Sequence, residues 1–417
     1  MPLIAKSRWT RFAAVAGPGI VVMLADTDAG SVITAAQSGV QWGYKLLMLQ
    51  LILIPILFIV QELTVRLGIV SGKGHGELIQ QHFGLGWAVL SVGTLVVACI
   101  GALLTELSGL AGVGLLFGIP AWATMLVIVV GLIVMVYTSS YLSVERIAIV
   151  IGAFELIFLL VAWKANPDTL TMLSEAVAIP WQDPRYLYLA AANIGAVIMP
   201  WMVFYQQSAA VEKKLTVEDL PTARWDTAFG AVLTQLIMAA VLIATAATIG
   251  KVNKAATLDT VQQIAEAMTP FLGQGMGKIL FAAGMVGSAL VATIVVTLTA
   301  ARTVGELLGV KHSLEHAPRE APWFYGVYTV SLIIGGLIVA SGINLVSLSV
   351  GVQVMNALLL PIVLGFLYLL ARRLPEPYRL KGMYAAFVAG IILLAAGFGV
   401  YAGLTGIAHQ LRFLKRF

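Results

Sequence analysis

Two carboxylates lie in the middle of an apolar stretch near the start of the chain. The stretch reads GPGIVVMLADTDAGSVITAAQSG, in which Asp26 and Asp28 flank Thr27 and are followed by Gly30 and Ser31. A charge at the centre of a bilayer costs at least about 2.5–3.5 kcal/mol, so two neighbouring acids there require a cation or a proton. Gly30 permits the backbone to leave helical geometry. The pattern predicts a cation site, and the alternative is a structural pair satisfied by backbone and water.

The composition indicates that lipid surrounds these acids. Of the 417 residues, 60% are hydrophobic and 11% are charged, and the mean hydropathy is +0.95. A soluble domain has about 25% charged residues, so the apolar excess must face a bilayer. The single cysteine, Cys99, allows neither a disulfide framework nor a thiolate cluster. We expect no nucleic acid, no cleavable signal peptide, no bound cofactor and no obligatory protein partner.

Eleven apolar runs are long enough to cross a bilayer, which takes about 20 residues each. They predict an all-α polytopic membrane protein with spans at 17–39, 44–70, 86–117, 121–139, 143–163, 187–211, 225–250, 274–302, 323–341, 344–371 and 382–406.

The distribution of Lys and Arg predicts the orientation of these spans. With a cytoplasmic N-terminus, sixteen basic residues fall inside and nine outside, which favours that orientation in the plasma membrane. The basic tail HQLRFLKRF then lies outside, which argues against it. The segment IAKSRWTRF places Trp9 and Phe12 beside Arg8 and Arg11, as is typical of an interfacial anchor.

A second interruption is predicted in the sixth span, YLAAANIGAVIMPWMVFYQQSAAV. Pro200 lacks a backbone donor and clashes with the preceding turn, which frees carbonyls near Ala196. Interrupted spans at corresponding positions of two repeats indicate a transporter site at the membrane midplane. Spans 1–5 and 6–10 then form two halves, at 1–163 (with the N-terminal segment) and 187–371, and 382–406 is an extra helix. Alone, a mid-span proline is also compatible with a mere kink.

The same two segments resemble the Nramp family of divalent metal transporters, which have the LeuT-type five-plus-five inverted repeat with broken helices 1 and 6. The family's first span has GPG, eight residues, and then Asp-Pro-Gly-Asn, and here DAGS stands at 28–31 after GPG. Its sixth span has Gly-Ala-x-x-Met-Pro-His, and here GAVIMPW stands at 195–201. The stretches RLGIVSGK (66–73) and LLFGIP (115–120) are also similar to the family, and the likeness covers most of the chain.

The resemblance implies a set of metal ligands. Asp28 would be the anionic ligand and Met199 the soft one, with the carbonyls of Ala25 and Ala196 completing the shell. Ser31 replaces the family's Asn and still offers an oxygen. We add Asp26 and Gln353 as further candidate ligands, and expect the site to be lined by Thr27, Gly30, Pro200, Trp201 and Asn356.

The chain departs from the family pattern at positions that the resemblance links to proton transport. Trp201 replaces the His after Met-Pro and cannot take up a proton. In the third span the family's Thr-Asp-Leu-Ala-Glu reads TELSG at 105–109, so the second acid is missing. Proton coupling of the usual kind is therefore in doubt, and the chain is expected to be a divergent branch. The candidates for a coupling path are Glu106, Glu155 and Glu62, although Glu62 equally suits an ion pair with Arg66.

The donor types favour a borderline transition metal. A carboxylate beside a thioether suits Mn²⁺ or Fe²⁺, whereas Mg²⁺ and Ca²⁺ gain nothing from sulfur. Met199 is otherwise simply an apolar helix residue, and the extra acid Asp26 suits a larger site for partly hydrated Mg²⁺. Mn²⁺ fits both descriptions and is the first choice. Gln353 and Asn356 share a helix face, which serves either this site or helix packing.

Other classes of function fit the sequence less well. The five histidines (His75, His82, His312, His316, His409) fall in polar segments or the tail, so no histidine metal site is expected within the membrane. A channel usually shows a repeated filter, and an intramembrane enzyme needs a nucleophile with a base or a motif such as H-E-x-x-H, so we expect no enzyme. The stronger rival is a carrier of an organic cation, seated by Asp28 and Trp201.

Overall fold

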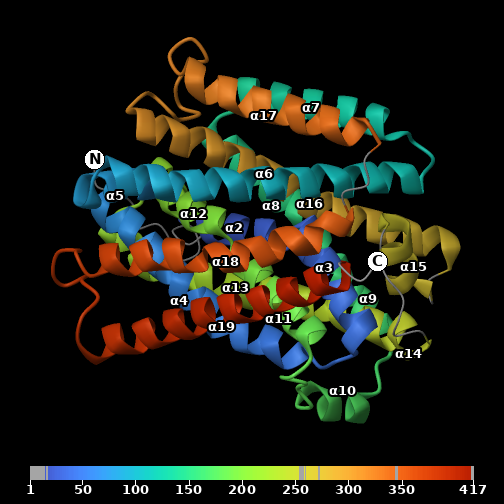
Figure 1. Cartoon of the computed structure of the whole chain (residues 1–417). Coiled ribbons are helices and arrows are strands. Elements are labelled where there is room, and N and C mark those ends of the chain that lie inside the picture. Colours follow the sequence, from blue (N-terminus) through green and yellow to red (C-terminus); the bar gives the residue numbers. More distant parts are fainter. Residues whose placement is uncertain are drawn as a thin grey trace, which may run out of the picture.

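The computed structural model describes residues 15, 17–252, 258, 260–270, 273–342 and 346–414, and these residues form helices joined by short loops (Figure 1). The expected interfacial anchor around Trp9 and Phe12 lies outside the described residues. No strand occurs in the described part of the chain. The prediction of an all-α protein is confirmed.

The helices of the first half include two short pieces, α2 and α3, where one span was expected. Their bounds are α2 Pro18–Asp26, α3 Ala29–Trp42, α4 Leu47–Ser71, α5 His75–Phe83, α6 Leu85–Leu116, α7 Ala121–Thr138, α8 Tyr141–Gly152, the 3₁₀ turn η1 Ala153–Leu156, α9 Ile157–Lys164 and α10 Thr169–Ala176.

The second half is likewise interrupted at its first span. Its bounds are α11 Pro184–Val197, α12 Pro200–Glu212, η2 Val217–Asp219, α13 Leu220–Ala247, α14 Ile249–Val252, α15 Val261–Met268, α16 Gln274–Leu308, α17 Pro322–Ala340, α18 Val346–Ala371 and α19 Gly382–Leu414.

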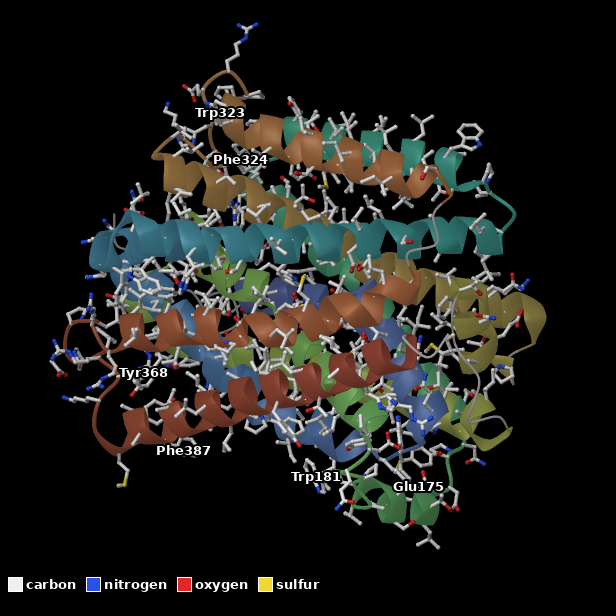
Figure 2. All side chains as sticks on the ribbon, in the orientation of Figure 1. Glu175, Trp181, Trp323, Phe324, Tyr368 and Phe387 are labelled. Atoms are coloured by element: carbon white, nitrogen blue, oxygen red, sulfur yellow. The ribbon has the colours of Figure 1, made fainter. Side chains whose placement is uncertain are left out.

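Eleven spans agree with the sequence prediction. Ten described segments are long and apolar enough to cross a membrane, and the bent pair α2 and α3 makes an eleventh. Large side chains face outward along these spans: Trp323 on α17 is 60% exposed and Phe387 on α19 is 57% exposed (Figure 2). Because such surface is costly in water, lipid is its natural surrounding.

The broken spans lie at the centre of the bundle. The most apolar part of Pro184–Glu212 is 94% buried, against 22% for α7. Helices α7 and α17 lie side by side at the periphery (Figure 1). The interior therefore holds the segments with the interrupted backbone, as a site at mid-membrane requires.

Loops that the sequence assigns to the same side of the membrane lie at the same end of the helix bundle. The loops 309–321 and 372–381 lie at the left in Figure 1, and the loop 117–120 and α15 lie at the right. Ion pairs are buried in the bundle, with Lys213 Nζ 2.6 Å from Glu145 and Arg66 Nη2 2.5 Å from Glu62. Which end faces the cytoplasm stays a prediction.

Candidate functional site

The first break separates α2 from α3. Helix α2 ends at Asp26, α3 begins at Ala29, and the two axes are bent by 48°. Asp28 is the N-cap of α3: its Oδ1 accepts a hydrogen bond of 2.6 Å from the Ser31 amide. Asp at this position is a preferred cap because it satisfies an amide with no partner in the helix. The helix that Asp28 starts therefore also fixes its carboxylate.

Glu106 of α6 holds this break open. In an unbroken helix the Ala29 amide would donate to the Ala25 carbonyl, four residues earlier. Instead the Ala29 amide donates to Glu106 Oε2 at 2.9 Å. The close packing of α6 against α3 uses Gly109, whose added Cβ would lie 2.7 Å from the Ala29 Cβ. The Ala25 carbonyl thus loses its helical donor and is available as a ligand.

The second break follows from a proline. Pro200 is the first residue of α12, and Ile198 and Met199 have non-helical backbone angles. The nitrogen four residues after Ala196 belongs to Pro200, which has no hydrogen to donate. The Ala196 carbonyl is therefore freed in the same way as that of Ala25. Met199 is the N-cap of α12, and its side chain is fully buried.

The two breaks face each other. The Ser31 hydroxyl donates to the freed Ala196 carbonyl at 3.1 Å, which joins the start of α3 to the end of α11. Ser31 and Ala196 are both buried. The Asp28 carboxylate, the Ser31 hydroxyl and the Ala196 carbonyl are thus gathered where the two interrupted spans meet. Half-helix ends of this kind are suited to cations because their last carbonyls carry partial negative charge.

Helix α18 adds two amide side chains from a third direction. Gln353 Nε2 lies 3.4 Å from Asp28 Oδ1, and Asn356 Nδ2 donates to Gln353 Oε1 at 2.9 Å. Gly195 permits this approach, because a Cβ there would lie 1.8 Å from the Gln353 carbonyl. Gln353 therefore reaches the first break through a close crossing of α11 and α18, and Asn356, on the same helix face, bonds to Gln353.

The carboxyl groups of Asp28 and Glu106 lie beside each other. Asp28 Oδ2 and Glu106 Oε1 have no hydrogen-bond partner within the described structure. Two adjacent carboxylates repel unless a positive charge joins them. The described residues hold no group of three His, Cys, Asp or Glu side chains suited to a metal ion. A divalent ion here would therefore need carbonyl and sulfur donors besides these acids.

Asp26 points to a different flank of the break. Its Oδ2 lies 3.4 Å from the Thr234 hydroxyl of α13, and the Thr27 hydroxyl is 2.9 Å from that same hydroxyl. The structure thus brings Asp28, Ser31, Gln353 and Glu106 together, and places Asp26 and Thr27 toward α13. Trp201, expected to line the site, is fully buried on α12, and its indole nitrogen has no partner among described residues.

The other two acids proposed for a coupling path have different surroundings. Glu62 is paired with Arg66 and with Arg224, whose Nε is 2.7 Å away, so the ion-pair interpretation describes it. Glu155 lies in η1, where the fifth span changes from α to 3₁₀ geometry. Its carboxylate faces Thr27 and is fully buried.

One histidine differs from the sequence prediction. His75 was assigned to a polar segment, but it is the first residue of α5 and is fully buried. Its Nδ1 is 2.8 Å from Gln207 Oε1 of α12, and its ring packs edge-on against Phe204. Burial lowers the pKa of His75 to about 4, so the ring is neutral at pH 7. The glycine-rich sequence around His75 gives no indication of its contact with Gln207.

Comparison with known proteins decides the family. Residues 19–405 match the family model described as Nramp, natural resistance-associated macrophage protein-like. The chain belongs to the Nramp family. A relative from Bradyrhizobium diazoefficiens, named divalent metal cation transporter MntH, is 26% identical over 97% of this chain and 91% of its own length. The resemblance inferred from the two interrupted motifs is confirmed.

Solved structures establish the fold of this Nramp protein. A manganese transporter from Eremococcus coleocola superposes with a TM-score of 0.79 at 20% identity, covering 98% of this chain and 89% of its own. Mhp1, a transporter of the nucleobase-cation-symport-1 family, superposes with a TM-score of 0.57 at 16% identity, covering 96% and 93%. At these identities the likeness concerns the fold alone, and it supports the predicted LeuT-type architecture.

Proposed function

We propose that this Nramp protein carries a divalent metal ion across the plasma membrane by alternating access, with its N-terminus in the cytoplasm. Mn²⁺ is the first substrate and Fe²⁺ the second. Membership in the Nramp family supports a membrane transporter, and the relative's name refers to divalent metal cations. The central, buried position of both interrupted spans supports a site reached alternately from either side.

The proposed ligands come from the two breaks. Asp28 supplies a charged oxygen, Met199 a thioether, and Ala25 and Ala196 their carbonyls. The observation that carries this assignment is the symmetrical loss of helical donors: the Ala29 amide is taken by Glu106, and Pro200 has no amide hydrogen. The Ser31 hydroxyl, which donates a hydrogen bond to the Ala196 carbonyl, is proposed as a further oxygen ligand.

The donor set distinguishes the proposed ion from its rivals. Thioether sulfur stabilises Mn²⁺, Fe²⁺ or Cd²⁺ and contributes nothing to Mg²⁺. Mg²⁺ would gain most from Asp26, whose carboxylate points toward Thr234 rather than toward the partners of Asp28. An organic cation would contact the Trp201 ring by a cation–π interaction, and its binding would require no metal ion.

Proton coupling is proposed to differ from the usual family pattern. Trp201 is not titratable, and Gly109 stands where the family's motif in the third span has its second acid. Glu106 is then the acid nearest to Asp28, and its carboxylate also fixes the first break. A change at Glu106 would therefore alter the metal site and any proton movement together.

Uptake into proteoliposomes tests the proposal. Mn²⁺ uptake is measured against Mg²⁺ competition with a pH dye inside, for the wild type and for Asp28→Ala, Met199→Ala and Met202→Ala. Asp28→Ala is expected to abolish uptake. Met199→Ala should weaken Mn²⁺ and Cd²⁺ about tenfold, or about 1.4 kcal/mol, and leave Mg²⁺ within about twofold. Met202, also buried on α12 but within the helix, is the matched control and should leave the selectivity unchanged.

Two results would contradict the proposal. An equal loss of all ions in Met199→Ala removes the soft-ligand role and leaves Mg²⁺ as the better substrate. Purified protein that binds no metal, with Asp28→Ala indistinguishable from the wild type, favours the organic-cation carrier instead.

A further inference from the structure

A second group of oxygen atoms lies on the flank of the first break that faces away from Gln353. We call Asp26, Thr27, Glu155 and Thr234 the Asp26–Glu155 cluster. The Thr27 and Thr234 hydroxyls are 2.9 Å apart, and Thr234 Oγ1 is 3.4 Å from Asp26 Oδ2. Three separate spans contribute, because Glu155 comes from η1 and Thr234 from α13. All four residues are at most 1% exposed.

Both acids of this cluster have unused oxygen atoms. Neither oxygen of Glu155 accepts a hydrogen bond from a described residue, and Asp26 Oδ1 has no partner there either. The Glu155 carboxylate faces the Thr27 hydroxyl and lies within electrostatic range of Asp26 and Asp28. A fully buried carboxylate that faces one hydroxyl and two other acids indicates a missing positive charge.

No basic side chain supplies that charge. The groups that act on Asp26 and Glu155 in the described structure are acids and hydroxyls. The buried basic side chains Arg66, Lys213 and Arg302 are instead paired with Glu62, Glu145 and Glu212. A buried carboxylate requires an ion-pair partner, a bound cation or a proton. The Asp26–Glu155 cluster therefore has the character of a cation site separate from the ligands proposed for the divalent metal.

We propose that the Asp26–Glu155 cluster binds a monovalent cation, Na⁺. Its side-chain donors are all oxygen atoms, which excludes a preference for a soft metal. It contains two acids, fewer than the three His, Cys, Asp or Glu side chains of a side-chain metal cluster, and the described structure has no such group. Two carboxylates and two hydroxyls can surround a small singly charged ion, which offsets one of the two negative charges.

The two ions are coupled through the break itself. Thr27 joins Asp26 to Asp28 along the chain, and the Asp26 and Asp28 carboxylates interact electrostatically. Na⁺ in the cluster cancels negative charge that would otherwise attract a divalent ion to Asp28. Each ion therefore weakens the other by the same factor. This coupling, unlike Na⁺ binding, rests on the proposed divalent site.

Thermal unfolding of metal-free protein in detergent tests the binding. At constant ionic strength, Na⁺ in place of choline or K⁺ should raise the Tm of the wild type and of Asp28→Ala by about 2 °C or more. Glu155→Gln and Thr234→Val should lose this rise. Thr245→Val is the matched control, since Thr245 lies on the same helix and its hydroxyl bonds only to the backbone of Val241 and Leu242.

Absence of a Na⁺-specific rise in the wild type overturns the proposal and leaves a proton as the counter-charge. A rise that persists in both Glu155→Gln and Thr234→Val overturns it as well. For the coupling, Na⁺ should raise the Kd for Mn²⁺ by about fivefold or more in the wild type and not in Glu155→Gln. Loss of Mn²⁺ binding in every buffer would instead contradict the proposed function, while the Tm result for Na⁺ would still stand.

Discussion

The two interrupted spans reach the same result by different means. At the second break Pro200 removes the amide hydrogen, so the Ala196 carbonyl is freed by covalent structure. At the first break the Ala29 amide is intact and is held away from Ala25 by Glu106 on another helix. The second interruption is therefore permanent, whereas the first depends on one side chain.

This difference assigns separate tasks to the two breaks. The Glu106 carboxylate at the first break can take up a proton or bind an ion, whereas Pro200 at the second break can do neither. The first break, with Asp26, Asp28 and Glu106 around it, is thus the part of the site that responds to charge. In the proposed site the second, with Met199 and a fixed carbonyl, would contribute selectivity and a constant shape. Changes at each break should separate these tasks.

The largest effect is expected at Glu106. Glu106→Leu removes the acceptor of the Ala29 amide, which then bonds to the Ala25 carbonyl or stays unpaired, at a cost of about 2–3 kcal/mol. Mn²⁺ affinity should fall about 30- to 150-fold in calorimetry. Glu106→Gln keeps an oxygen acceptor at this position and should lose much less. Equal losses in the two variants would show that the charge of Glu106, and not its hydrogen bond, is what matters.

A smaller effect is expected from repairing the second break. Pro200→Ala restores an amide hydrogen opposite the Ala196 carbonyl, so that a continuous helix can form across the break. The restored bond competes with metal coordination, and we expect a loss of Mn²⁺ affinity of about 5- to 30-fold, or about 1–2 kcal/mol. Transport kinetics in proteoliposomes measure it. Unchanged affinity would mean that the Ala196 carbonyl is not a ligand.

The smallest effect is expected at the contact between the breaks. Ser31→Ala removes the hydroxyl that donates to the Ala196 carbonyl, a hydrogen bond worth about 0.5–1.5 kcal/mol. Mn²⁺ affinity should change by about 2- to 10-fold, with the Tm nearly constant. Thr34→Ala, one turn further along α3, is a matched hydroxyl deletion and should leave affinity unchanged. If Ser31→Ala lost more Mn²⁺ affinity than Glu106→Leu, the contact between the breaks would matter more than the hydrogen bond that holds the first break open.

Much of the fold follows from the sequence because membrane spans depend on long apolar runs. The expected spans 86–117 and 121–139 correspond to α6 and α7 within a residue or so. Both breaks were also predictable, since Pro200 and the Asp26–Gly30 segment are local signals. The turn to 3₁₀ geometry at η1 and the burial of His75 were not, because they depend on neighbours from distant parts of the chain.

Site residues were harder to predict than spans for the same reason. Asp28 and Met199 carry their own signals as an intramembrane acid and a pre-proline residue. The hydrogen bond from Ala29 to Glu106 joins residues 77 positions apart, and nothing near Glu106 indicates it. The separation of Asp26 from the partners of Asp28 likewise requires the backbone turn between the two half-helices. Two aspartates separated by one residue therefore lie on different flanks of the break.

The cap formed by Asp28 on α3 has a consequence for the empty carrier. A transporter must also return through the bilayer after it has released its cargo, and a bare buried charge would make that step prohibitively slow. Here the Asp28 carboxylate accepts a hydrogen bond of 2.6 Å from the Ser31 amide, a donor that belongs to the chain itself. The unloaded protein thus keeps a hydrogen-bond donor for the buried Asp28 carboxylate. We expect this donor to ease the return of the empty carrier, which completes the transport cycle.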